Sequence, residues 1–173
     1  MTMKYLLILF VCMHHGVHAQ DIDPNRRLLE MGIQLGEMKA PIANYAKAVQ
    51  SGKLLFLSGH IPDEVVGKKT RGKIGLQLTV DEGKEAAKIT TIGLLSTLKY
   101  YAGDLKNVKR IVKVTGMLNT DPAFTQHPTV MNGCSDLLVA VFGDAGRHAR
   151  AAVGMSSLPL DAAIEIEMVV ELK

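Results

Sequence analysis

The chain has 173 residues, 47% of them hydrophobic and 21% charged, a size and composition that fit one folded domain and argue against a disordered chain. A formal net charge of only +3, no tryptophan, four tyrosines and four phenylalanines argue against a dedicated nucleic-acid surface or an aromatic stacking platform. No apolar run reaches the roughly 20 residues that span a bilayer.

The N-terminus has the three-part layout of a secretory signal peptide over residues 1–19. A short cationic start precedes the apolar run 5–13, and Val17 and Ala19 occupy the −3 and −1 positions of a cleavage site. A buried first strand or a short membrane anchor is the alternative, although the run is too short for a stable anchor. We therefore expect an exported protein, periplasmic or secreted, with no stable membrane anchor after the signal peptide is removed.

After the signal peptide we expect an N-terminal extension, residues 20–40, and then one domain over residues 41–173. The extension is polar and predicts a frayed start or a short helix near residues 26–31. The domain opens with two predicted strands, 45–50 and 53–58, which a tight turn joins.

The apolar run 54–57 predicts that the second of these strands is buried on both faces. The following polar segment, 59–75, predicts a loop with a short strand. A capping box at residues 79–82 then predicts a helix that extends to about Tyr101, and Gly103 stands where a C-terminal cap belongs.

The second half of the domain predicts a strand over 108–118, a helix from about 128 to 142, and two final strands over 148–155 and 163–172. The expected inner faces consist of Val108, Val112, Val114 and Leu118 in the first strand, and of Val130, Cys134, Leu137, Leu138 and Val141 in the helix.

This order of elements predicts an α+β domain of two layers, one β-sheet with two helices on one of its faces. The other face of the sheet would then have no covering layer. Because the strands are rich in leucine and valine, we expect another subunit to bury that face.

The polar residues give few sites that could carry chemistry. His60, His127 and His148 lie on separate segments without metal-ligand spacing, so we expect no metal. The sequence also lacks a glycine-rich phosphate-binding loop, so we expect no other cofactor. Cys134 lies on the apolar face of a predicted helix, which favours a buried, unreactive thiol over a nucleophile.

Arg150 is the exception, because it stands in a strand of small apolar residues. An arginine is costly to bury there without a partner. It could form an ion pair with Glu165 or Glu167 on the next strand, or it could present its planar guanidinium to the carboxylate of a ligand.

Residues 150–167, with Arg150 followed by Leu-Pro and then by a Glu-x-Glu pair, resemble the C-terminal signature of the RidA/YjgF family of enamine/imine deaminases. Upstream, Ser-Gly-His-Ile-Pro at 58–62 and Gly-Asp-Leu at 103–105 are similar to further motifs of that family. The resemblance covers about residues 32–172.

The resemblance implies a chorismate-mutase-like fold, with one mixed β-sheet, assembled as a homotrimer with ligand clefts between the subunits. It implies that Arg150 binds the substrate carboxylate, while Tyr45, Ser58 and Asn132 line the cleft. Glu167 would position the amino group, or hold the attacking water and take its proton. The implied reaction is the hydrolysis of a 2-imino or 2-enamino acid to a 2-keto acid and ammonia, without a cofactor.

Two features resemble a divergent branch of that family. Ala152 stands where the archetypal members carry a cysteine, and the loop 143–148 is longer than theirs. Arg147 and His148 either line the cleft or belong to a solvated loop.

Besides the deaminase, two other functions remain as alternatives: a non-catalytic trimeric binder of small carboxylates, and an endoribonuclease or translation inhibitor. The weak net charge argues against the second of these. The expected partners are an imino-acid or small carboxylate ligand and further copies of the chain, with no nucleic acid.

Overall fold

The computed structural model describes residues 23–41 and 43–173. The signal peptide predicted over residues 1–19 therefore lies outside the described residues. The helices and strands are α1 (Pro24–Glu30), β1 (Ala48–Ser51), β2 (Leu54–His60), α2 (Val80–Ala102), β3 (Val108–Asn119), α3 (His127–Phe142), β4 (Ala149–Met155) and β5 (Ile164–Leu172). No helix within this described part of the chain is both long and apolar enough to cross a membrane.

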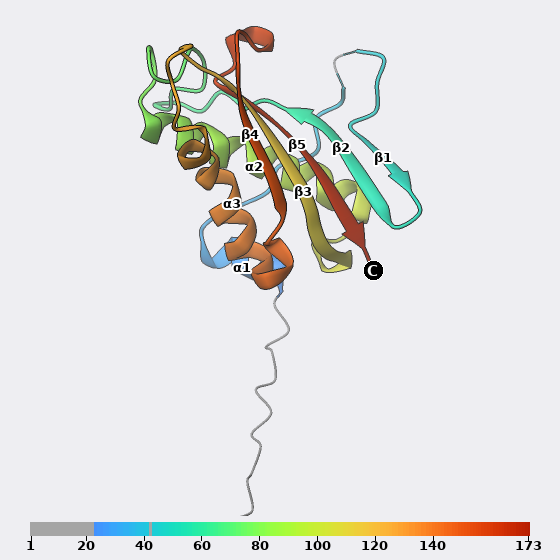
Figure 1. Ribbon diagram of the computed structural model, residues 1–173. Helices are drawn as coiled ribbons and strands as arrows, with labels where there is room; N and C mark the ends of the chain where they lie inside the picture. The colour runs from blue at the N-terminus through green and yellow to red at the C-terminus, as the bar shows by residue number, and fades with distance from the viewer. Residues whose placement is uncertain (1–22, 42) are drawn as a thin grey trace, which may run out of the picture.

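The strands form one mixed sheet in the order β1-β2-β5-β3-β4, in which β3 and β4 are parallel and the other neighbours are antiparallel (Figure 1). Helix α2 packs on β2 and β5, and α3 packs on β3 and β4, so both helices cover the same face. The predicted two-layer α+β fold is confirmed. The short helix α1 lies beside α3, where Leu28 is buried.

The long helix α2 begins and ends as the sequence predicts. Its capping box is formed by Thr79 and Glu82, which exchange hydrogen bonds between side chain and backbone, and the helix ends at Gly103, whose φ of 74° suits glycine. In α3, all five residues of the predicted inner face are buried. The helices therefore present their apolar stripes to the sheet.

Three predictions about the strands are wrong, one for the segment 59–75, one for β3 and one for the uncovered face of the sheet. The segment 59–75 forms isolated bridges at Arg71 and Ile74 rather than a short strand, because glycines with positive φ at 67, 72 and 75 interrupt its extended backbone. In β3, Ile111 is buried in place of Val112. Register shifts against β5 between Val108 and Arg110, and again between Ile111 and Lys113, change which side chains point inward.

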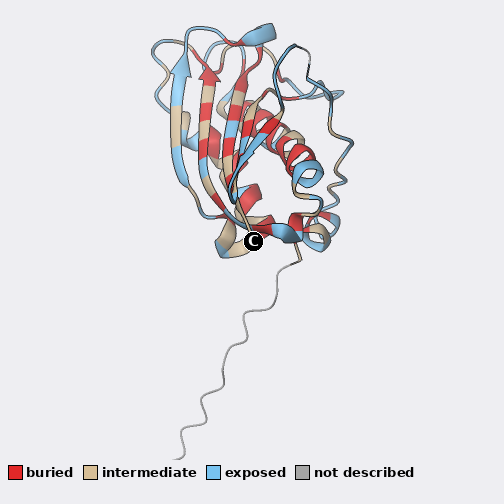
Figure 2. Ribbon diagram, turned by 90° about the vertical axis from the view of Figure 1, so that its right-hand side faces the viewer, coloured by how far each residue is buried: buried red, intermediate tan, exposed pale blue. Residues whose placement is uncertain are grey.

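The sheet is covered on one face only. Figure 2 shows buried residues alternating with less buried ones along the central strands, as in β2 and β5. Because successive side chains of a strand point to opposite faces, the buried ones lie on the side of the helices, in the core. On the other face, Val49 is 59% exposed and Phe56 is 45% exposed, so the prediction that residues 54–57 are buried on both faces is wrong for a single chain. The expectation that another subunit covers this open face stays a prediction.

Helices α2 and α3 come into close backbone contact at Gly133. A Cβ atom on this residue would overlap the backbone carbonyl oxygen of Lys84. Glycine is thus required by a close approach of two backbones, and this approach places the adjacent Asn132 relative to the sheet.

Replacing Gly133 by alanine should lower the free energy of unfolding by about 1–3 kcal/mol, because the added methyl group overpacks the contact between α2 and α3. Urea denaturation measures the change. Gly36→Ala is the control, since a Cβ at Gly36 would meet no atom within 4 Å. Equal stability of the two variants would contradict this role of Gly133.

Candidate functional site

Arg150 is tied to helix α3 rather than to an acidic residue. Its Nη1 donates hydrogen bonds to Asn132 Oδ1 and to Ser135 Oγ, both at 3.0 Å. No ion pair joins Arg150 to Glu165 or Glu167 among the described residues, so the predicted alternative of a structural pair with one of these glutamates is wrong. Arg150 is exposed at the edge of the sheet.

The hydrogen bonds continue from Ser135 to His148, the residue just before β4. Ser135 Oγ lies 3.1 Å from His148 Nε2, and His148 Nδ1 lies 2.7 Å from the carbonyl oxygen of Gly146. Burial lowers the pKa of His148, and the nearby charge of Arg150 lowers it further, against the hydrogen bond to Gly146. These effects favour a neutral imidazole.

The neighbouring Arg147 has a different role. It is exposed and pairs with Asp144 at 3.2 Å within the loop that precedes β4. This contact is a surface ion pair, which contributes little to stability. Of the two loop residues singled out in the sequence, His148 is thus the one that contacts the surroundings of Arg150.

A second group of polar side chains lies on and beside the open face of the sheet. Ser58 in β2 donates its hydroxyl to the carbonyl oxygen of Ala46 at 2.7 Å. Tyr45 is 42% exposed just before β1, and Lys47 Nζ lies 5.7 Å from its ring centroid. The segment before β1 is therefore tied to the end of β2, where Ser58 stands.

Glu165 belongs to this second group and has the most perturbed environment in it. Its carboxylate packs on Gly59, where a Cβ atom would overlap it. Burial raises the pKa of Glu165, and the charge of Glu167 raises it further, whereas Lys47 lowers it. A carboxyl group with a raised pKa can exchange protons closer to neutral pH than an exposed one.

The predicted site residues thus fall into two groups on opposite faces of the sheet. In the sheet, Arg150 of β4 lies opposite Val114 of β3, which is buried under the helices. Glu167 of β5 lies opposite Thr115, the next residue of β3. Because successive side chains of a strand point to opposite faces, Arg150 lies on the helix side and Glu167 on the open side. Asn132 joins Arg150, and no single ligand can bind Arg150 and Glu167 of one chain through the sheet.

Cys134 is buried and free, as predicted, and burial raises its pKa to about 11 despite the hydrogen bond with Thr91 and the charge of Arg150. Its thiol is therefore not a nucleophile at neutral pH. No group of three or more histidine, cysteine or acidic side chains among the described residues is arranged to hold a metal ion.

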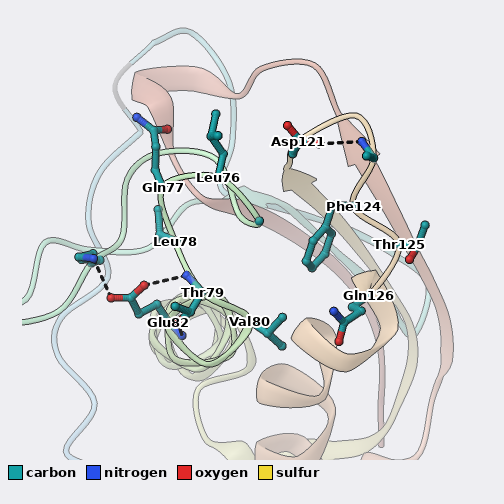
Figure 3. A pocket seen from close by; sticks show the side chains of 13 residues that line it. Leu76, Gln77, Leu78, Thr79, Val80, Glu82, Asp121, Phe124, Thr125 and Gln126 are labelled. Carbon is teal, nitrogen blue, oxygen red and sulfur yellow. Dashed lines mark hydrogen bonds and ion pairs between the residues drawn. The ribbon is translucent and has the colours of Figure 1, made fainter.

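A surface cavity of about 570 Å³ lies away from all of these residues, between the start of α2 and the loop after β3 (Figure 3). Its acidic groups both have partners: Glu82 bonds to the backbone of Thr79 and to Lys69 at 2.9 Å, and Asp121 accepts a hydrogen bond from the backbone of Ala123 at 2.8 Å. Phe124 and Val80 supply apolar lining. Because Glu82 holds the helix cap and Asp121 holds the turn after β3, this cavity offers less chemistry than the surroundings of Arg150.

Sequence reasoning missed Ser135 as a partner of Arg150, and it mentioned Glu165 only as a possible ion-pair partner. Ser135 stands three residues after Asn132 and one helical turn further on the same side of α3, a spacing that could have indicated a shared target. No pattern in the sequence indicates that Gly59 accommodates the carboxylate of Glu165, because that contact joins two strands.

Comparison with known proteins relates most of the chain to one family. The family model described as "YjgF/chorismate_mutase-like, putative endoribonuclease" matches residues 25–172. Protein TCP17 of Trypanosoma cruzi is 44% identical over 146 residues, which are 84% of this chain and 91% of that protein.

Two solved structures are similar over nearly the same range. A protein of unknown function from Agrobacterium tumefaciens has 38% identity and a TM-score of 0.78, covering 87% of this chain and 94% of that one. A "putative endoribonuclease" from Shewanella oneidensis has 34% identity and a TM-score of 0.82, covering 87% of this chain and 99% of that one.

Proposed function

The chain belongs to the RidA/YjgF family, and from this membership we propose that it hydrolyses reactive 2-imino and 2-enamino acids to 2-keto acids and ammonia. The observation that carries the proposal is the guanidinium of Arg150, which the protein orients through one nitrogen and leaves exposed. Such a group recognises a small carboxylate, and a 2-imino acid carries its carboxylate next to the carbon that reacts.

Arg150 has five N–H donors, and the described residues use those of Nη1 alone, for Asn132 and Ser135. The edge formed by Nε–H and Nη2–H remains for a ligand, and this edge matches a carboxylate through two parallel hydrogen bonds. Binding the carboxylate in this way fixes the position of the adjacent imine carbon, which lowers the entropic part of the barrier.

Glu165 and Glu167 supply the proton transfer in this proposal. Water adds to the carbon of the protonated imine while a carboxylate takes one of its protons, which gives a carbinolamine. The carboxylic acid returns this proton to the amino nitrogen, the C–N bond breaks, and the hydroxyl proton passes through the carboxylate to the departing ammonia as the carbonyl forms. We assign the proton to Glu165, whose pKa is raised by burial and by the charge of Glu167. Glu167, the residue that the family resemblance implies, also has its carboxylate on this face, where it can hold the amino group or the water.

Because the two groups of residues lie on opposite faces of one sheet, a complete site requires two chains. We propose a homotrimer in which the open face of one subunit packs against the β4 edge of another. The exposed Val49 and Phe56 support this arrangement, since an apolar surface of this kind favours burial. Tyr45 and Ser58 of the open face would then line a cleft that receives Arg150 from the neighbouring subunit.

The first prediction concerns Arg150. Imino acids generated in situ by an amino-acid oxidase serve as substrates, and ammonia or keto-acid release is followed in a coupled assay. Arg150→Ala should lower kcat/KM by about a hundredfold, because orientation of the substrate carboxylate is lost, and should leave assembly intact. Arg147→Ala, at the neighbouring surface arginine, is the matched control. Full activity of Arg150→Ala would refute the assignment.

The second prediction distinguishes the two glutamates. Glu165→Gln should lower kcat by about a hundredfold or more if it carries the proton. Glu167→Gln should lower kcat less than Glu165→Gln does, and it should move the acidic limb of the kcat/KM profile to lower pH, because removing the charge of Glu167 lowers the pKa of Glu165. A loss of turnover in Glu167→Gln alone would place the proton transfer on Glu167.

A third prediction tests the assembly. Light scattering should give three chains per particle, and Phe56→Asp on the open face should give single chains. Val66→Asp is the control, because Val66 is 102% exposed in a loop. A monomeric wild-type protein would refute the trimer and with it the site shared between subunits.

Two other functions give different outcomes in the same assays. A non-catalytic binder of small carboxylates would bind a 2-keto acid through Arg150 yet release no ammonia from any imino acid. The names of the family model and of the Shewanella relative suggest an endoribonuclease. RNA degradation by the pure protein that Arg150→Ala abolishes would support that activity instead.

A further inference from the structure

A chain of hydrogen bonds runs from Arg150 through Ser135 and His148 to Gly146. The chemistry of these groups determines which one donates in each bond. A backbone carbonyl only accepts, so the Nδ1 of His148, 2.7 Å from Gly146 O, carries a proton. In a neutral imidazole the other nitrogen, Nε2, is then an acceptor. Ser135 therefore donates its hydroxyl proton to His148 Nε2, and its lone pairs are left to accept from Arg150.

We infer that Ser135 and His148 are positioning residues that hold the guanidinium of Arg150 in the orientation that receives a planar carboxylate. We call the chain of donors and acceptors, from Arg150 through Ser135 and His148 to Gly146, the orienting relay. This inference rests on the role that the proposed function gives to Arg150.

The relay acts on the nitrogen that a ligand does not need. The two N–H groups of Nη1 donate hydrogen bonds to Asn132 and Ser135. These two residues stand three positions apart on α3, so they contact this nitrogen from successive turns of one helix. A rigid helix thus determines the plane of the guanidinium. The opposite edge, Nε and Nη2, is kept facing away from α3, which is the precondition for a bidentate contact.

Neutral His148 is part of this arrangement. If Nε2 also carried a proton, it would donate to Ser135 instead of accepting from it. His148 would then be positively charged, with only the hydroxyl oxygen of Ser135 between it and Arg150. Burial and the charge of Arg150 both lower the pKa of His148. The imidazole therefore stays an acceptor at neutral pH. The hydroxyl proton of Ser135 then points to His148, and the hydroxyl oxygen is free to accept from Arg150.

The same motif occurs elsewhere in the molecule without an arginine. His60 Nδ1 lies 2.8 Å from Ser58 O, and its Nε2 lies 2.8 Å from Thr97 Oγ1 on α2. There the hydroxyl is buried, and the motif ties β2 to α2. A purely structural role is thus the competing explanation for Ser135 and His148, and the test has to separate a tie between β4 and α3 from an effect on Arg150.

The experiment measures pyruvate, a simple 2-keto acid, binding to the whole protein by calorimetry, so that turnover is not required. Ser135→Ala should weaken binding up to about tenfold, because the freed guanidinium then has to be ordered when the ligand binds, and Ser135→Thr, which keeps the hydroxyl, should restore it. His148→Gln, which can present an acceptor near Nε2, should weaken binding less than His148→Leu. Ser96→Ala, at a serine on α2 whose hydroxyl bonds only to Ile92 O, is the control.

Unchanged pyruvate affinity in Ser135→Ala and His148→Leu, together with lower stability, would make the two residues a structural tie and overturn the inference. In the kinetic assay the relay predicts that Ser135→Ala raises KM more than it lowers kcat, because the group acts on the carboxylate and not on the proton transfer.

Nitrogen NMR keeps this test independent of the proposed function. In the free protein the N–H signals of Arg150 Nη1 should be resolved, and should broaden in Ser135→Ala as the guanidinium rotates freely. His148 should be protonated on Nδ1. Protonation on Nε2, or rapid rotation of the wild-type guanidinium, would overturn the relay whatever the enzyme's activity. A resolved relay with no pyruvate binding would instead count against the proposed function alone.

Discussion

The alternation of side chains along β3, β4 and β5 is the constraint on which the candidate site depends. Each strand sends successive residues to opposite faces, and the helices α2 and α3 cover one face only. Arg150, in register with Val114, is therefore directed to the side of the helices, while Glu167, in register with Thr115, is directed to the open side. A site that needs both charges has to be built from two chains.

Helix α3 fixes the orientation of the Arg150 guanidinium. Without its contacts, an exposed arginine at the edge of a sheet would sample many rotamers. Asn132 and Ser135 hold one nitrogen of the guanidinium, and the close approach of α2 and α3 at Gly133 holds the helix in place. On the open face, Gly59 leaves the space that the carboxylate of Glu165 occupies, because a Cβ there would overlap it. Glycines that allow close approach thus prepare both halves of the site.

Sequence patterns predicted the elements well where local rules govern them. The capping box at Thr79 and the glycine cap at Gly103 both appear as expected, because caps involve neighbours within one helical turn. The inner face of β3 was predicted less well, since bulges against β5 exchange Val112 for Ile111. A bulge arises from pairing with a distant strand, so no local pattern reveals it.

Local patterns in the chain were enough to determine the fold class, the family and the identity of Arg150 as the residue of interest, because strand and helix periodicity, caps and a spaced signature are all local properties. It took the tertiary structure to decide that Arg150 bonds to Asn132 and Ser135 instead of to a glutamate, and that Glu165 is the half-buried carboxyl group. The physical reason is that hydrogen-bond partners and desolvation depend on which strand or helix lies alongside, and that is settled by packing between segments far apart in the chain.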